Sequence, residues 1–140
     1  MPKSSASLVA LLLSAILLAA CSLTPGVSGR EVQIEGGSYQ AVNVQELLTM
    51  LGNKDFFMVN VHTPWQGDIT QTDLQLPFDQ IEQNLEQLPG DKEKKILVYC
   101  FSDGMAKIAV KSLIGLGYTN IWMLEGGTVA WEVAGQTLEK

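Results

Sequence analysis

Cysteine and histidine are scarce in this sequence. Its 140 residues include 2 cysteines, Cys21 and Cys100, and 1 histidine, His62. Protein zinc sites generally need three or four ligands from Cys, His, Asp and Glu, with Cys and His predominant in structural sites. One histidine and one free cysteine do not make a typical site of this kind. We therefore expect no metal, and no other cofactor is indicated.

Basic residues are also few, with 9 Lys and Arg against 15 Asp and Glu and a formal net charge of −6. No basic block or basic stripe is present, so the sequence lacks the positive surface that binds nucleic-acid phosphates. An acidic surface offers little attraction to anionic lipid headgroups. We expect no nucleic-acid partner, and any attachment to a membrane needs another device.

The first segment offers such a device. Lys3 precedes an apolar run over residues 8–18, which is shorter than the roughly 20 residues of a spanning helix and matches the about 7–15 residues of a signal peptide's hydrophobic region. Residues 18–21, Leu-Ala-Ala-Cys, resemble the lipobox of bacterial lipoproteins. That resemblance implies a signal peptide over residues 1–20 and a diacylated Cys21, with palmitate as a typical chain. An ordinary cleaved signal followed by a coincidental cysteine is the alternative.

If Cys21 carries lipid, the protein is anchored in the cell membrane or the outer membrane, with its domain outside the cytoplasm. Cys100 is then left without an intramolecular partner. A lone thiol is unusual in an exported protein, because oxidising compartments favour disulfides. A buried and inert cysteine is a common fate for this residue, so the surroundings of Cys100 must decide its role.

Residues 21–37 have the composition of a lipidated tether, interrupted by Pro25, Gly26, Gly29 and the pair Gly36 and Gly37. Only the alternation of Val32 and Ile34 hints at a short strand. Residues 38–140 are expected to form one domain, since the length suits one domain and 46% of the residues are hydrophobic.

Within this domain, short apolar runs alternate with helical patterns. The apolar runs are residues 56–61, 74–76, 96–99 and 121–124; the helical patterns are residues 45–51, 78–88, 105–116 and a last one around Val129 to Val133. Strands that are buried on both faces become nearly continuous apolar runs, which is typical of a parallel sheet covered by helices. We therefore predict an α/β fold, with a small parallel sheet of about five strands and helices on both faces.

Two chemically interesting residues directly follow strands of this sheet. Cys100 follows residues 96–99, and His62 follows residues 56–61. Ligands of such sheets bind outside the carboxyl ends of the strands. The spacing therefore places both residues at the edge where a ligand is expected.

The loop after the strand consists of Cys100, Phe101, Ser102, Asp103, Gly104 and Met105, and it leads into a long helix. Backbone N–H groups of such a loop and the positive end of the helix dipole favour an anionic sulfur. The thiolate is the nucleophilic form of cysteine, and helix N-termini stabilise it. Gly104 suits a tightly curled loop, which commonly needs a residue without Cβ. A cysteine that ends a strand is, however, also an ordinary core residue.

Three stretches resemble the rhodanese family. They are the strand–Cys100–loop–helix segment, residues 116–121 (Leu-Gly-Tyr-Thr-Asn-Ile), and residues 124–131 (Leu-Glu-Gly-Gly-Thr-Val-Ala-Trp). A looser similarity covers residues 57–65, where Asn60, Val61, His62, Pro64 and Trp65 correspond to the family's Asp-Val-Arg-x-Pro-Trp stretch. The resemblance extends over roughly residues 38–136.

The resemblance implies a rhodanese-like sulfurtransferase or persulfide carrier. Cys100 would take the sulfane sulfur of a small donor, hold it as a persulfide and pass it to a thiophilic acceptor, which is covalent catalysis in two steps. The rival hypothesis is a non-catalytic rhodanese-like module on the membrane surface that binds a small ligand or a protein. The sequence does not identify a protein partner.

Several positions depart from the family pattern. Asn60 replaces the usual Asp, His62 replaces a common Arg, and Met105 stands where an Arg is often found, beside the acidic Asp103. Phosphatases of the same fold carry an Arg six residues after the cysteine, but here that position is Ala106, so phosphate would be poorly held. These changes leave the sulfur-carrying role in place and leave the donor open.

The remaining site residues have two interpretations each. His62 is either hydrogen-bonded scaffold or part of the pocket, and Trp65 and Phe101 either pack in the core or shape the pocket mouth. Asp103 either caps the helix that follows it or points to solvent.

Overall fold

The computed structural model describes residues 26–140, so the expected signal peptide, the lipobox and Cys21 lie outside the described residues. The elements, in chain order, are β1 (Arg30–Ile34), β2 (Gly37–Val42), α1 (Val44–Leu51), β3 (Phe57–Asn60), β4 (Leu74–Gln75), the 3-10 helix η1 (Glu82–Gln87), β5 (Ile96–Tyr99), α2 (Gly104–Gly115), β6 (Ile121–Leu124) and α3 (Gly127–Val133). The α/β fold predicted from the alternating pattern is confirmed.

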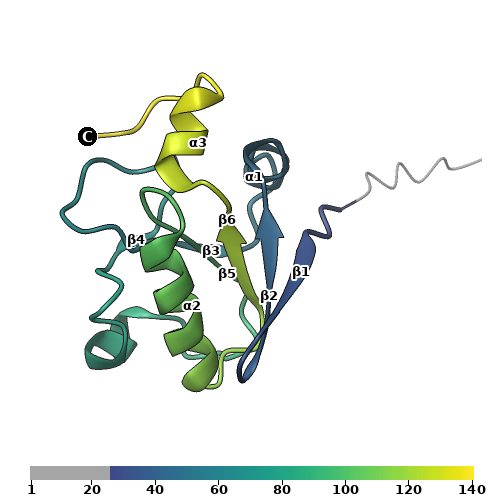
Figure 1. The fold of residues 1–140 in the computed structure, drawn as a ribbon, viewed down its shortest axis with the longest axis vertical. Helices are drawn as coiled ribbons and strands as arrows, with labels where there is room; N and C mark the ends of the chain where they lie inside the picture. The colour runs from purple at the N-terminus through teal and green to yellow at the C-terminus, as the bar shows by residue number, and fades with distance from the viewer. Residues whose placement is uncertain (1–25) are drawn as a thin grey trace, which may run out of the picture.

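The strands form one six-stranded sheet in the order β1-β2-β6-β5-β3-β4 (Figure 1). Every neighbouring pair is parallel except β1 and β2, which form an antiparallel hairpin. The hairpin turns at Gly36, whose φ of 90° favours a residue without Cβ. The sheet therefore has one strand more than expected, and it includes residues 30–37, which the sequence pattern assigned to the tether.

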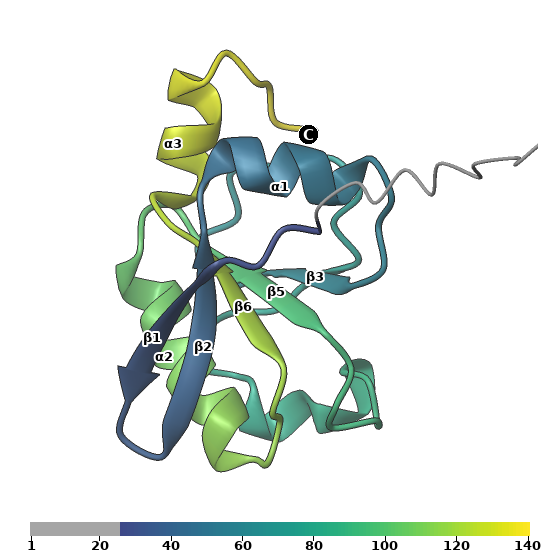
Figure 2. The same cartoon turned by 90° about the vertical axis from the view of Figure 1, so that its right-hand side faces the viewer.

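Helices cover both faces of the sheet, as predicted. Helix α2 packs on one face, in a core with β3 and β5 residues such as Val59 and Val98. Helices α1 and α3 pack on the other face, where Leu47 and Trp131 join Leu97. Figure 2 shows α1 and α3 beside each other, with α2 behind the sheet. Two cores separated by one sheet explain why the central strands read as continuous apolar runs.

The predicted helix over residues 78–88 is wrong in type and in length. The structure has only the 3-10 segment Glu82–Gln87, and the backbone leaves helical geometry at Asn84, with φ −131° and ψ 37°. The side-chain amide of Asn84 donates to the carbonyl oxygen of Gln80 at 2.9 Å. Asparagine competes with the helix by bonding to nearby backbone in this way, which the apolar spacing alone does not reveal.

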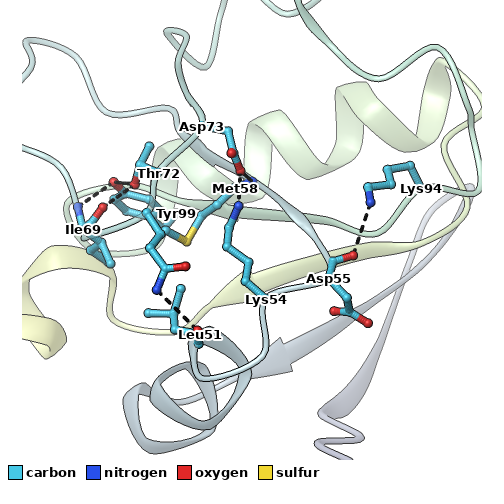
Figure 3. Close-up of polar contacts among 10 residues, drawn as sticks. Leu51, Lys54, Asp55, Met58, Ile69, Thr72, Asp73, Lys94 and Tyr99 are labelled. Atoms are coloured by element: carbon cyan, nitrogen blue, oxygen red, sulfur yellow. Dashed lines mark hydrogen bonds and ion pairs between the residues drawn. The ribbon is translucent and has the colours of Figure 1, made fainter.

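The segment that joins β3 to β4 is fastened to β3 and to the neighbouring strand β5 (Figure 3). The Tyr99 hydroxyl of β5 accepts the Ile69 N–H at 2.9 Å and lies 2.8 Å from the Thr72 hydroxyl. Asp73 accepts the Met58 N–H at 2.7 Å and pairs with Lys54. These contacts fasten the connection to β5 at Tyr99, the residue before Cys100, and to β3 at Met58.

In residues 26–140 no helix is both long enough and apolar enough to cross a membrane.

Candidate functional site

Cys100 lies where the sequence pattern places it, one residue beyond the last residue of β5 and just before α2. Its side chain is 1% exposed. The N–H of Ala106, in the first turn of α2, donates to the Cys100 Sγ over 3.4 Å. The strand end and the helix start therefore meet at the sulfur, and a hydrogen bond from a helix N-terminus favours its anionic form.

The backbone of the Cys100 loop is fastened to the start of α3. The N–H of Thr128 donates to the Cys100 carbonyl at 2.9 Å, and the N–H of Val129 donates to the Phe101 carbonyl at 3.1 Å. The first-turn N–H groups of a helix lack partners within their own helix, so these bonds satisfy both α3 and the loop. They also direct the two loop carbonyls toward the start of α3.

Gly127 permits this close approach. A Cβ on Gly127 would lie 2.1 Å from the Cys100 carbonyl oxygen, and its φ is 53°. Glycine is thus required at this position because the loop that carries Cys100 packs against its backbone. The Leu-Glu-Gly-Gly stretch is in this sense a part of the site.

Asp103 makes a contact that neither sequence interpretation anticipated. It is the N-cap residue of α2, but its side chain forms no capping hydrogen bond to that helix. Its Oδ1 instead accepts the N–H of Gly126 at 2.9 Å. Both expected arrangements are therefore wrong: the carboxylate spans from the Cys100 loop to the turn before α3.

His62 lies beside the Cys100 loop. Its ring and that of Phe101 have centroids 5.5 Å apart, with an interplanar angle of 30°. Its backbone N–H donates to the Asn60 side chain at 3.0 Å, and its carbonyl accepts from the Gln75 side chain at 3.2 Å. Both ring nitrogens are buried and have no hydrogen-bond partner among the described residues. The backbone of His62 is thus scaffold, whereas its imidazole makes no hydrogen bond to any described residue.

The other loop residues give the site an apolar and uncharged rim. Phe101 is 44% exposed, Ser102 and Gly104 are exposed, and Met105 is half-buried. Trp65 is 46% exposed, and no described hydrogen bond or ring contact joins it to Phe101 or His62. The structure therefore brings His62 and Phe101 together at the Cys100 loop and, among the described residues, shows no contact of Trp65 with either ring.

Asn60 has a larger role than the sequence indicated. It is 1% exposed, and its Nδ2 donates to the Gly67 carbonyl at 3.1 Å and to Asp68 Oδ1 at 2.9 Å. Its Oδ1 accepts the His62 N–H. One buried amide therefore fixes the turn that carries His62. A polar residue inside an apolar strand is the signal that could have revealed this role, since buried polar groups are nearly always hydrogen-bonded.

Across residues 26–140 the structure contains no cluster of three or more His, Cys, Asp or Glu side chains that is arranged to hold a metal ion. The described site offers a buried thiol that accepts a hydrogen bond from the Ala106 N–H, in a loop whose Phe101 ring lies near the His62 ring.

Comparisons with known proteins point to the same region of the chain. A family model described as a rhodanese-like domain matches residues 39–134. A protein of Allochromatium vinosum named sulfurtransferase is 32% identical over 81 residues, which cover 56% of this chain and 73% of that protein. The family match runs from β2 into α3 and includes the Cys100 loop.

Solved structures agree. A rhodanese-related protein from Thermoplasma volcanium superposes with a TM-score of 0.60 at 25% identity, covering 71% of this chain and 97% of that chain. A protein from Anabaena sp. gives a TM-score of 0.60 at 25% identity, covering 70% of this chain and 79% of that chain. The similarity thus extends over nearly the whole described domain.

Proposed function

We propose, from the premise that the chain belongs to the rhodanese-like domain family, that it carries sulfane sulfur as a persulfide on Cys100. The observation that carries the proposal is the hydrogen bond from the Ala106 N–H, at the start of α2, to the Cys100 Sγ. A thiolate in that position is stabilised by the N–H group and by the helix dipole. The outer sulfur of a persulfide is anionic as well and gains from the same field.

The reaction consists of two displacements on sulfur. The Cys100 thiolate attacks the outer sulfur of a donor persulfide; a new S–S bond forms, the donor S–S bond breaks, and its electron pair leaves with the donor thiolate. An acceptor thiolate then attacks the outer sulfur on Cys100, and the Cys100 thiolate leaves. Each step exchanges one S–S bond for another, so no external oxidant or reductant is needed.

The burial of Cys100 suits a carrier of a labile group. Sγ is nearly inaccessible in the resting site, whereas a transferred sulfur lies about 2 Å beyond it. A dry surrounding limits side reactions of a reactive intermediate with water. The exposed Phe101 ring belongs to the loop, and the buried His62 nitrogens lie beside it. In this proposal these two side chains contact the rest of the donor molecule, and Trp65 forms a further part of the rim.

The proposal includes a membrane location. The Leu-Ala-Ala-Cys motif at residues 18–21, directly after the apolar run, supports cleavage before Cys21 and acylation of its thiol and amine. Two or more chains on one residue anchor firmly, because each buried CH₂ contributes about 0.8 kcal/mol. The domain would then meet its donor and acceptor on the outer side of the membrane that holds it.

A non-catalytic binding module is the second candidate function. The observation in its favour is the absence of any Lys or Arg among loop residues 101–105. A family member without sulfur chemistry would keep the pocket and bind a ligand or a protein there.

Intact-protein mass spectrometry separates the two functions. The full-length protein in detergent is treated with inorganic polysulfide, and Cys100→Ser is treated in parallel. The wild type should gain the mass of one sulfur atom, which cyanide or a thiol then removes, while Cys100→Ser folds normally and gains none. A wild type that gains no sulfur supports the binding module; a Cys100→Ser variant that fails to fold returns Cys100 to a purely structural role.

A further inference from the structure

We infer that Asp103 is a positioning residue for Cys100. Its carboxylate holds the Cys100 loop against the turn before α3, and so keeps the Ala106 N–H directed at Sγ. The inference rests on the proposed sulfur-carrying function and deepens it, because it assigns a role to an acidic side chain that would otherwise only repel an anionic sulfur.

Three hydrogen bonds from backbone N–H groups join the Cys100 loop to residues 126–129, beside a longer one from the Thr128 hydroxyl to the Phe101 carbonyl at 3.5 Å. Two of them run between backbone groups, from Thr128 to Cys100 and from Val129 to Phe101. The third runs from the Gly126 N–H to the Asp103 carboxylate at 2.9 Å. The first two fix the part of the loop before Ser102, and the third fixes the part that enters α2.

The third bond acts on the start of α2, because Asp103 lies there. The Asp103 carbonyl accepts the Lys107 N–H at 2.9 Å, so this residue sets where α2 begins. The Ala106 N–H, which reaches Sγ, belongs to the same first turn. A residue that ties this turn to the Gly126 backbone therefore controls the distance between a helix N–H and the sulfur, although no hydrogen bond among the described residues joins its carboxylate to Sγ.

Two roles of Asp103 predict different results. If its charge alone matters, removal of the charge by either Asn or Ala has the same effect, and both variants react faster with anionic donors. If its oxygen positions the loop, Asp103→Asn retains the acceptor for the Gly126 N–H, whereas Asp103→Ala loses it. Loss of the acceptor leaves the partly buried Gly126 N–H without this hydrogen bond, which has a measurable energetic effect. The experiment detects this effect as a change in the reactivity of Cys100.

The test uses the full-length protein and the variants Asp103→Asn, Asp103→Ala and Asp79→Ala. Asp79 is an exposed carboxylate with no described hydrogen bond and serves as the matched control. The first readout is the pH profile of alkylation by iodoacetamide, a neutral reagent that transfers its carboxamidomethyl group to the thiolate with loss of iodide. The second is the rate of sulfur loading from inorganic polysulfide.

With a positioning role, Asp103→Ala should show an alkylation profile moved to higher pH and loading about tenfold slower. Asp103→Asn should lie nearer to the wild type in both readouts, and Asp79→Ala should match the wild type. Equal behaviour of Asp103→Asn and Asp103→Ala would overturn the inference. If the wild type takes up no sulfur, the proposed function fails, but the alkylation profiles still decide whether Asp103 positions Cys100.

Discussion

The phenol oxygen of Tyr99 lies 2.9 Å from the backbone nitrogen of Ile69, which donates to it across the gap between β5 and the β3–β4 connection. The same oxygen is 2.8 Å from the Thr72 hydroxyl (Figure 3). Tyr99 is fully buried, and this burial is the main reason why the pKa of its phenol is raised well above the ordinary value. The residue before Cys100 is thus a structural one.

Tyr99→Phe should lower the free energy of unfolding by about 1–3 kcal/mol at neutral pH, because a buried Ile69 N–H loses its acceptor. The unfolded chain releases the Tyr99 proton near its ordinary pKa of about 10, while the folded chain retains it. The contribution of the Tyr99 hydroxyl to the free energy of unfolding is therefore fully present below about pH 10 and declines at higher pH. Urea unfolding at several pH values should show the two proteins converging above pH 10; a constant difference between them would contradict the assignment.

Much of the fold follows from local patterns. Ile96–Tyr99 and Ile121–Leu124 are strands with the bounds that their apolar runs predict, because a strand that is buried on both faces carries apolar residues at consecutive positions. Strand β1 has only the alternation of Val32 and Ile34, and its antiparallel pairing with β2 depends on the turn at Gly36. Such a weak edge signal does not distinguish a strand from a tether.

The features of the site likewise fall into two groups, those that local sequence predicts and those that depend on tertiary packing. The place of Cys100 could be predicted, since a strand end and a helix start are both local features. The partner of Asp103 could not, because Gly126 is remote in the sequence and meets the loop only through the packing of α3. The free nitrogens of His62 are likewise a property of the three-dimensional surroundings.

His62→Phe should leave the stability unchanged or raise it by about 1 kcal/mol, since it removes two buried nitrogens without partners among the described residues. The ring contact with Phe101 can be retained by the new ring. If the imidazole binds the donor, sulfur loading falls about tenfold in His62→Phe, which corresponds to about 1.4 kcal/mol, and is partly restored in His62→Gln. Thermal unfolding and loading rates are measured together; unchanged loading would show that His62 has no part in the pocket.

The proposed lipid anchor predicts the behaviour of Cys21→Ala. Without an acyl acceptor, the protein should appear in the soluble fraction or remain an unprocessed precursor. Detergent-phase partitioning and the mass of the mature N-terminus are the measurements, with Cys100→Ala as the control that keeps its anchor. A processed Cys21→Ala protein that still partitions into detergent would rule out acylation at this position.

The apolar rim predicts which sulfur donors the protein uses. Thiosulfate is a dianion, and loop residues 101–105 offer it no cation, only Asp103 with the opposite effect. The attraction that remains comes from N–H groups and from a helix dipole equivalent to roughly half a positive charge. We therefore expect thiosulfate to load Cys100 more slowly than a small alkyl persulfide, which carries at most one negative charge.

Met105→Arg tests this electrostatic argument directly. Met105 is half-buried in the first turn of α2, so an Arg there can extend along the apolar surface and place its guanidinium at the loop. Ser112→Arg adds the same charge about 10 Å further along the helix and serves as the control. Met105→Arg should raise the loading rate about tenfold with thiosulfate and only about threefold with a monoanionic alkyl persulfide, because a dianion gains twice the interaction with one new charge. The gain should shrink as salt is added, since ions screen an exposed pair. A wild type that prefers thiosulfate, or an equal gain with both donors, would show that charge at the rim does not select the donor.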